Sequence, residues 1–390
     1  MIYDCGRGIG SVGWVSMSLR GLAVAIAGVF FDRLDVENVE RVPVDRPVML
    51  VANHHSGLMD AMMLYASTPR ELRAIGKSTL WKIWPLRPFL AAGRVIPVYR
   101  RKDGGGDNSK AFDAVAQALV EGDAVAIFAE GVSHDGLGLE RIRTGAARMT
   151  LDAVHAGAKP VIVPVGLIFE DRERFRSDAL VRFGEPIEVV DSFPDSSSED
   201  QVAVRSLTDA IEAGLRSVAP TWASGEVRAS ARTAAMLDLP VGASLGEIET
   251  RAEELAEAGL LPEPDSDLVG RHGEADLLVP LDEIDLEDSL LLWPFAMAGK
   301  ILNRPPFWLV KFVAERQARN IRATVKASGG IVAYPLWWAG IVAATRRSGI
   351  SWSGSIATAA AVAVLGVISA REMPVSSAER RTLAWLQKRR

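Results

Sequence analysis

Short apolar runs alternate with amphipathic stretches through the first half of the chain. Each run leads into polar residues or a turn, which is typical of a buried strand that feeds a loop. The predicted strands are 46–54, 93–100, 123–131 and 159–169. The predicted helices are 60–68, 107–122 and 145–157, and Asp107 or Asn108 can cap the second of them.

This alternation of strands and helices favours an α/β fold with a mostly parallel central sheet flanked by helices. A further strand and turn are predicted at 179–189. In such a sheet the carboxyl ends of parallel strands meet at one edge, and binding sites form there. Polar residues that follow these strands are therefore the candidates for a functional site.

Beyond residue 190 the strand pattern ends. The polar stretch 191–200 is predicted to link to a helix near 198–217, and 244–261 is predicted to be a polar helix. The stretch 262–278 is acidic and loop-rich. Together these features indicate a solvated helical insert.

Two apolar stretches near the C-terminal end are close in length to a membrane-spanning helix. They are 328–345 and 355–370, and neither carries a charge between its ends. Lys and Arg residues precede the first and follow the second, which predicts a membrane hairpin with both outer flanks in the cytoplasm. Arg346 and Arg347 in the connecting loop weaken that bias. A fully buried helical hairpin is the alternative.

The N-terminal end also has an apolar segment. The run 21–31 is too short to span a bilayer, so 11–31 is predicted to be an interfacial helix that dips into one leaflet. A buried first helix is the alternative. The absence of a basic region ahead of it argues against a cleaved signal peptide.

These patterns divide the chain into four regions. They are an N-terminal membrane-associated helix at 1–35, an α/β domain at 36–220, a helical acidic insert at 221–285 and a C-terminal helical membrane region at 286–390. The high mean hydropathy of +0.14, despite 24% charged residues, fits lipid-facing segments.

Composition narrows the possible classes of protein. The formal net charge of the 390-residue chain is −5, which argues against a dedicated nucleic-acid binder. Its one cysteine, Cys5, excludes an internal disulfide framework and a multi-cysteine zinc site. The candidate catalytic and binding residues are therefore histidines, carboxylates and arginines.

One apolar stretch carries a cluster of polar side chains. Residues 51–64, VANHHSGLMDAMML, contain Asn53, His54, His55 and Asp60. Asp60 lies five positions after His55 and six after His54, so the stretch holds candidates for a base and its orienting carboxylate. Alone this is a weak signal, because such pairs arise by chance in a chain of this length.

Three further clusters are predicted to meet at the same edge of the sheet. Arg100 and Arg101 follow one strand, and Pro164 and Gly166 lie at the end of another. A third strand is followed by Glu130, Gly131, Ser133 and His134, with Arg141 and Arg143 on the loop beyond. A base, a carboxylate and fixed cations would converge there, as a compound with a hydroxyl and a phosphate requires.

In order and approximate spacing, the four clusters resemble the motifs of the glycerolipid acyltransferase superfamily, whose members acylate glycerol-3-phosphate or lysophosphatidate. The H-x4-D box is matched by His55 and Asp60, with Asn53 in front. The remaining motifs are matched by Gly93, Ile96, Pro97 and Arg100, by Glu130 and Gly131, and by Val163, Pro164 and Gly166.

The resemblance covers roughly residues 30–190 and is closer to the glycerol-3-phosphate branch. That preference comes from the stretches GRVIPVYR, EGVSHD and FRSDALVRFGEPI. The segment RATVKASGGIVAYPLWW also resembles the membrane tail of long bacterial and yeast-type members of that branch. The resemblance thus makes 36–220 an acyltransferase domain.

The resemblance implies transfer of a fatty acyl group from acyl-CoA or acyl carrier protein to a hydroxyl. His55 is expected to be the general base, a task that imidazole suits near neutral pH, and Asp60 to fix its tautomer. Substrate contacts are expected from Arg100, Arg101, Arg143, Glu130, Gly131 and Pro164, and support from Asn53, Gly93 and Ser133. No resident cofactor or metal is expected, and the enzyme should act at the cytoplasmic face of a bacterial inner membrane.

The sequence departs from the family pattern at two points. Ala129 stands where the Glu-Gly box usually has proline, which is expected to loosen the turn. The pattern is also filled without His54, so the resemblance gives that residue no role.

Other functions remain open on the sequence. In the alternative assignment, the acyl acceptor is lysophosphatidate or another lysophospholipid. A metal-dependent hydrolase is disfavoured, because adjacent histidines rarely point to one centre and no H-x-x-x-H pair appears. A non-catalytic lipid-binding membrane protein is disfavoured by the intact set of polar residues.

Overall fold

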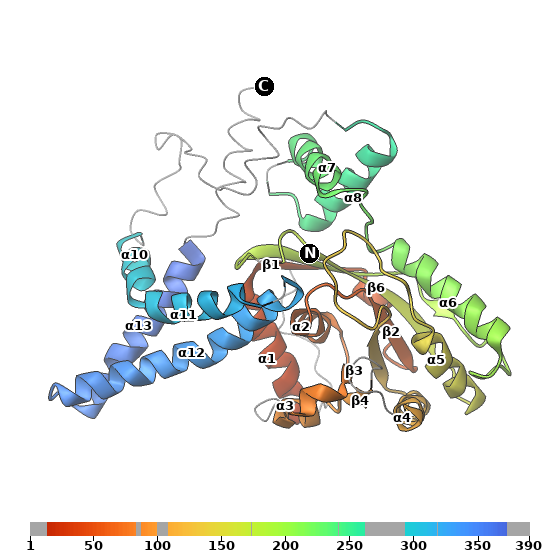
Figure 1. The fold of residues 1–390 in the computed structure, drawn as a ribbon, viewed down its shortest axis with the longest axis horizontal. Coiled ribbons are helices and arrows are strands. Elements are labelled where there is room, and N and C mark those ends of the chain that lie inside the picture. The colour runs from red at the N-terminus through yellow and green to blue at the C-terminus, as the bar shows by residue number, and fades with distance from the viewer. Residues whose placement is uncertain are drawn as a thin grey trace. The chain divides into compact units, whose positions relative to one another are not determined.

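The computed structural model describes residues 14–82, 87–99, 108–172, 174–240, 242–261, 293–317 and 319–372 (Figure 1). The chain divides into two compact units. The first consists of Met1–Gly28, Leu34–Phe169 and Ala179–Ala223, and the second of Val29–Arg33, Glu170–Asp178 and Ser224–Arg390. Arg100, Arg101 and the acidic stretch 262–278 lie outside the described residues.

The first unit is built on a mostly parallel sheet, as the sequence predicts. Its strands lie in the order β1 (Phe31–Glu37), β7 (Ser177–Phe183), β6 (Val161–Phe169), β2 (Val48–Ala52), β5 (Ala124–Phe128), β3 (Leu72–Lys77) and β4 (Ile96–Val98), while β8 (Ile187–Glu188) pairs with β6. The pairings β2–β5, β2–β6, β3–β5 and β3–β4 are parallel, whereas β7 and β8 run antiparallel to β6.

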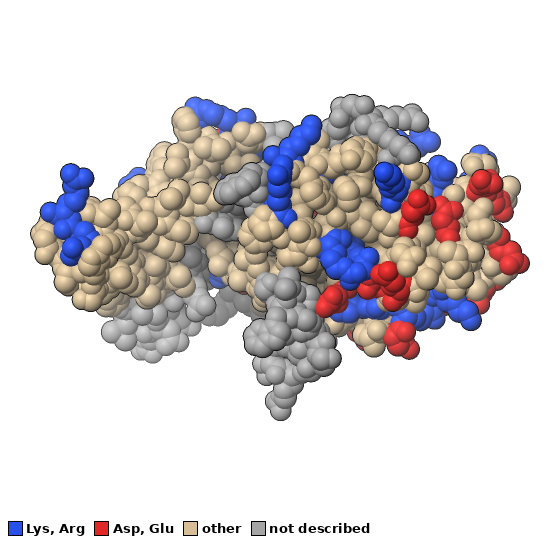
Figure 2. Space-filling view, turned by 90° about the horizontal axis from the view of Figure 1, so that it is seen from below, with Lys and Arg blue, Asp and Glu red and all other residues tan. Residues whose placement is uncertain are grey.

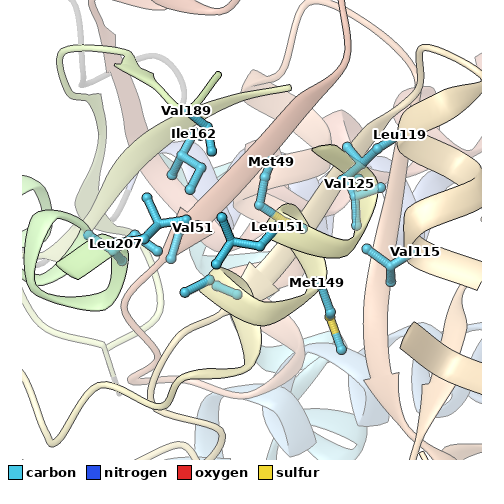
Figure 3. Packing of buried hydrophobic residues seen from close by; sticks show 14 of the residues in the cluster. Met49, Val51, Val115, Leu119, Val125, Met149, Leu151, Ile162, Val189 and Leu207 are labelled. Atoms are coloured by element: carbon cyan, nitrogen blue, oxygen red, sulfur yellow. The ribbon is translucent and has the colours of Figure 1, made fainter. Parts of the chain in front are cut away.

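The core lies on the sheet face covered by three helices. They are α4 (Ser109–Val120), α5 (Gly145–His155) and α6 (Gln201–Arg216). Met49 and Val51 of β2 point toward them together with Val125 and Ile162 of the neighbouring strands (Figure 3). Because successive strand residues point to opposite faces, the fully buried Leu50 faces the other way, so both faces of β2 are covered.

Shorter elements complete the first unit. They are α1 (Trp14–Phe30), which continues into the second unit, α2 (Leu58–Ser67), α3 (Arg87–Ala92) and 3₁₀ turns at Val39–Arg41 and Ser78–Lys82. Asp200 caps α6 through the N–H groups of Val202 and Ala203. Asn108 occupies the N-cap position of α4 but makes no side-chain capping bond, since its amide binds Tyr99 of the preceding segment.

Strand β6 lies within the strand predicted at 159–169. Pro164 and Gly166 were expected at its carboxyl end, but they lie in its middle. Its first half pairs with β2, where Pro164 lies opposite Val51, and its second half pairs with β7. Pro164 is therefore inside the sheet, where its Cγ faces Gly214 of α6.

The second unit contains a polar helical pair. It consists of α7 (Gly225–Asp238) and α8 (Leu245–Glu257), and α8 matches the polar helix predicted at 244–261. Ser244 and Glu247 form a capping box at its start. The buried Glu249 carboxylate is paired with Arg232 of α7, and burial lowers the pKa of nearby Arg228 to about 10.

The second unit also contains four apolar helices. They are α10 (Trp293–Leu302), α11 (Arg304–Glu315), α12 (Arg319–Arg347) and α13 (Trp352–Glu372). The predicted stretches 328–345 and 355–370 are helical and belong to α12 and α13. Among the described residues, one helical stretch, Trp352–Ser369, is long and apolar enough to cross a membrane. Insertion of a hairpin therefore stays a prediction.

Gly166 provides a test of how α6 is held on the sheet. A Cβ atom at this position would lie 2.0 Å from the main-chain oxygen of Val218, just beyond α6. We expect Gly166→Ala to lower the free energy of unfolding by about 1–3 kcal/mol, since backbone atoms must shift. Chemical denaturation of the purified protein measures the loss.

Gly145→Ala is the matched control in the same unit. The nearest atom to its added Cβ is Ile127 Cδ1 at 4.0 Å, so we expect little change in stability. Equal denaturation midpoints for the two variants would contradict the close packing at Gly166.

Candidate active site

The end of β2 is fixed by the side chain of Asn53. Its amide donates to the main-chain oxygen of Leu167 at 3.0 Å and accepts the N–H of the same residue at 2.7 Å. Asn53 is buried, so these two bonds replace the strand pairing that would otherwise continue. The chain leaves the sheet at a defined point, and His54 begins the site loop.

Asp60 organises this loop from the first turn of α2. Its carboxylate is fully buried, and Oδ2 accepts the main-chain N–H groups of His55 and Ser56, each at 2.8 Å. The same oxygen lies 2.7 Å from Nδ1 of His54. Hydrogen bonds of this kind, together with the positive end of the helix dipole, stabilise a buried carboxylate.

The structure corrects the expected pairing of Asp60 with the His55 ring. The imidazole hydrogen-bonded to Asp60 belongs to His54, whereas His55 contributes its main-chain N–H. The physical reason is that the backbone of residues 55 and 56 turns its N–H groups toward the carboxylate, so the ring that reaches Oδ2 comes from the residue before. Which ring removes a proton in the reaction stays a prediction.

The His54 ring is held on two sides. It stacks on Phe128, at the end of β5, with ring centroids 4.0 Å apart and planes 11° from parallel. With Nδ1 directed at Asp60, Nε2 is the nitrogen available to exchange a proton with a bound molecule. A neutral His54 that donates from Nδ1 therefore presents a basic Nε2.

A second histidine–carboxylate pair lies beside the first. Glu130 is buried, and its Oε2 is in contact with Nε2 of His134. Nδ1 of His134 accepts the N–H of Gly136 at 3.0 Å, so in the neutral ring the proton is on Nε2, facing Glu130. His134 also donates its main-chain N–H to the oxygen of His54 at 3.2 Å. The two pairs are thus joined through the backbone.

The turn after β5 brings a cation next to this pair. Gly131 has a φ of 70°, in the region that favours glycine, and its N–H closes the turn on the oxygen of Phe128 at 3.1 Å. The main-chain N–H of Arg143 donates to the oxygen of Ala129 at 2.8 Å, and Cγ of Arg143 lies 3.7 Å from where a Cβ on Gly131 would be. Arg143 therefore lies beside Gly131, and its predicted contact with the substrate stays a prediction.

The departure at Ala129 has a structural reason. Its N–H donates to the oxygen of Ala52 at 3.1 Å, which extends the β2–β5 pairing by one bond. A proline has no N–H and would lose this bond. The turn expected to be loosened by alanine is closed here.

The remaining predicted residues fall into different places. Gly93 lies against Tyr65, whose hydroxyl would be 3.1 Å from an added Cβ, and burial raises the pKa of that hydroxyl. Ser133 is on the loop that follows β5 and is half-buried. Pro164 is inside β6 against α6 rather than at the sheet edge. Arg100 and Arg101 lie outside the described residues, so their predicted contacts are untested.

The sequence reasoning missed one contributor to the site. Phe128 reads as an ordinary apolar strand residue, and only its place at the end of β5 marks it. His134 was named in a cluster predicted at this edge but was given no role, and it contacts both Glu130 and the His54 backbone. In the part of the chain that the structure describes, no three His, Cys, Asp or Glu side chains form a group able to hold a metal ion.

Comparison with known proteins finds similar sequences. Residues 33–168 match the family model "Acyltransferase". The chain is 27% identical over 257 residues to glycerol-3-phosphate O-acyltransferase 1 of Saccharomyces cerevisiae, a match that covers 56% of this chain and 34% of that protein. It is 44% identical over 85 residues to glycerol-3-phosphate O-acyltransferase 2 of the same yeast, covering 21% and 11%. The matched region thus spans about a third, or less, of these relatives.

A solved structure is also similar. It is the 1-acyl-sn-glycerophosphate (LPA) acyltransferase PlsC from Thermotoga maritima, with 17% identity, a TM-score of 0.38, and coverage of 52% of this chain and 79% of that one.

Residues 33–168 are therefore an acyltransferase domain. Over the matched regions the chain is similar in sequence to glycerol-3-phosphate O-acyltransferases.

Asn53 offers a test of how the site loop is anchored. We expect Asn53→Ala to lower the free energy of unfolding by about 2–4 kcal/mol, because it leaves the buried N–H and C=O of Leu167 unsatisfied. Denaturant titration followed by circular dichroism gives the value.

Asn108→Ala is the matched control. Asn108 makes the same two bonds, to the N–H and C=O of Tyr99 at 2.8 Å each, but at an exposed position. Water replaces both bonds there, so we expect a loss below about 1 kcal/mol. If Asn108→Ala lowered the free energy of unfolding more than Asn53→Ala, burial would not be what sets the cost of losing these two hydrogen bonds.

Proposed function

We propose that this protein transfers a fatty acyl group from acyl-CoA or acyl carrier protein to glycerol-3-phosphate. The preferred acceptor group in this proposal is the first hydroxyl of glycerol-3-phosphate. The observation that supports this most is the buried Asp60 carboxylate bonded to Nδ1 of His54 at the carboxyl edge of the sheet. A second support is the group of Glu130, His134 and Arg143 beside it. The similarity to two glycerol-3-phosphate O-acyltransferases favours this acceptor.

In the proposed reaction His54 is the general base, in place of the His55 expected from the spacing. Nε2 of His54 takes the hydroxyl proton while the hydroxyl oxygen bonds to the thioester carbonyl carbon. The tetrahedral intermediate collapses, the C–S bond breaks, and the imidazolium returns the proton to the leaving thiolate. Asp60 keeps Nδ1–H in place and stabilises the imidazolium, as in other histidine–aspartate pairs.

This mechanism needs no covalent enzyme intermediate. The acceptor attacks the thioester directly. The sequence has one G-x-S-x-G pattern, at residues 242–246, but its Ser244 is the N-cap of α8 in a capping box with Glu247 and does not follow a strand, as the serine of a nucleophile elbow does. The acyl thioester is a substrate, so the proposal includes no resident cofactor.

The neighbouring residues are proposed to hold the acceptor. Glu130, positioned by His134, accepts a hydrogen bond from a second hydroxyl of glycerol. Arg143 and the predicted Arg100 and Arg101 bind the phosphate, a task that suits the planar guanidinium group. The electrostatic attraction between a dianionic phosphate and these cations then selects glycerol-3-phosphate over uncharged alcohols.

We further propose that the protein works at a bilayer, in a bacterial inner membrane with its site facing the cytoplasm. The apolar α13 and the basic residues that flank the 328–345 and 355–370 stretches support this placement. The acyl chain of the product is apolar, so a bilayer is the natural destination of the product.

The acceptor is tested with purified protein and labelled acyl-CoA or acyl carrier protein. Glycerol-3-phosphate, lysophosphatidate and lysophosphatidylcholine are offered in parallel, and the labelled products are separated by chromatography. We expect glycerol-3-phosphate to be the best acceptor. Preference for lysophosphatidate would move the protein to the next acylation step. If neither donor gives any labelled product, the proposal is overturned.

The base is tested by replacing each adjacent histidine. We expect His54→Ala to lower kcat by about 10²–10⁴-fold, the usual contribution of a general base, and His55→Ala to lower it less than about tenfold. Both rings lie in the same loop, so His55→Ala controls for disturbance of the loop. Circular dichroism confirms that each variant folds. A full loss in His55→Ala with an active His54→Ala would restore the assignment made from spacing.

A further inference from the structure

The four apolar helices of the second unit differ from the helices of the first in which residues they bury and which they expose. The buried apolar residues of α10–α13 are mainly small, such as Ala296, Ala314 and Ala359, whereas the core of the first unit also contains fully buried Leu, Ile, Met and Phe side chains. A Cβ on Gly299 of α10 would lie 1.9 Å from the main-chain oxygen of Leu365 in α13, so these helices touch at the backbone. Close approach through small residues is typical of helices packed in lipid.

Helix α11 shows most clearly that small residues are buried while large apolar residues are exposed. Its buried positions are Pro306 and Ala314, while Trp308, Leu309 and Phe312 are 54%, 59% and 54% exposed. A surface helix in water places its large apolar residues inward and its polar residues outward. The outward face of α11 therefore requires an apolar environment.

Basic side chains border this outward face. The guanidinium groups of Arg304 and Arg316 lie over the rings of Trp308 and Phe312, with Cζ 5.7 Å and 3.3 Å from the ring centroids. Nζ of Lys311 is 5.8 Å from the centroid of Trp308. Such side chains lay their apolar stems along an apolar surface and keep the charge at its polar boundary.

The charge of the segment matches an anionic partner. Between residues 304 and 326 the sequence has six Lys or Arg residues and a single acidic one, Glu315, in a chain of net charge −5. Figure 2 shows a largely uncharged surface in the region where Figure 1 places α12 and α13, with Lys and Arg side chains at its margins.

The start of α11 is held firmly to the other helices. The buried amide of Asn303 donates to the main-chain oxygens of Gly299 and Val362, each at 3.0 Å, and its Oδ1 accepts the indole N–H of Trp338 at 3.2 Å. One side chain therefore links α10, α12 and α13 at the point where α11 begins. Side-chain hydrogen bonds of this kind fix the packing of helices in apolar surroundings.

We propose that α11 is an interfacial helix that binds the surface of an anionic phospholipid bilayer. Phe307, Trp308, Leu309 and Phe312 enter the acyl region, and Arg304, Lys311 and Arg316 contact lipid phosphates. The inference shares with the proposed function only the assumption that the protein meets a membrane. It does not depend on the chemistry of the His54 site.

The test places a fluorescent probe on α11 in the full-length protein. Cys5→Ser removes the single native cysteine, and Phe312→Cys then carries an environment-sensitive fluorophore. The matched control is Val202→Cys on α6, a position that is 79% exposed in the acyltransferase unit. The labelled proteins are reconstituted into vesicles of phosphatidylcholine alone or mixed equally with phosphatidylglycerol.

We expect lipids that carry a nitroxide near the headgroup to quench the probe at 312 at least about threefold more than the probe at 202. Iodide in the aqueous phase should show the reverse order. A probe at 312 that iodide quenches as at 202 would place α11 in water and overturn the proposal. A probe shielded from both quenchers would mean that protein covers α11, either another segment or a second copy, and would also overturn it.

A charge variant tests the anionic preference. We expect R304Q/K311Q/R316Q to lower lipid quenching at 312 by about twofold or more in the phosphatidylglycerol mixture, with little change in phosphatidylcholine alone. Equal quenching before and after the substitution in the anionic vesicles would overturn the anionic assignment. Acyl transfer is not the readout, so failure here is distinguishable from failure of the proposed function.

Discussion

The buried carboxylate of Asp60 is the interaction on which the geometry of the site depends. A carboxylate removed from water must receive hydrogen bonds, and those of Asp60 come from two consecutive main-chain N–H groups and the His54 ring. Because these donors are fixed in sequence, satisfying the charge also sets the course of residues 54–56. The same electrostatic requirement therefore shapes the loop and orients the imidazole.

Much of the first unit follows from the alternation of apolar and polar residues. Strands such as Val161–Phe169 are continuous apolar runs because both of their faces are buried. Strands β1 and β3 were missed, since Asp32, Arg33, Arg73 and Lys77 interrupt their apolar pattern. Helix α7 was missed because its stretch, GEVRASARTAAMLD, is rich in small and charged residues.

The site was predictable as a set of residues but not as a set of pairs. Spacing brought His54, His55, Asp60 and Glu130 to one edge of the sheet, because parallel strands end there. It did not distinguish the two adjacent rings, since that choice depends on which N–H groups turn toward Asp60. Pro164 was misplaced at the carboxyl end of a strand whose predicted bounds, 159–169, already put this residue near its middle.

The hydrogen bond from the His134 N–H to the His54 oxygen ties the loop that bears Glu130 to the loop that bears the imidazole. A change of substrate that remodels one loop must therefore displace the other. In the proposed reaction one loop holds the acceptor and the other carries the base, so a substitution in either loop is expected to change both acceptor affinity and turnover. Enlarging the site for a bulkier alcohol would then call for substitutions in both loops.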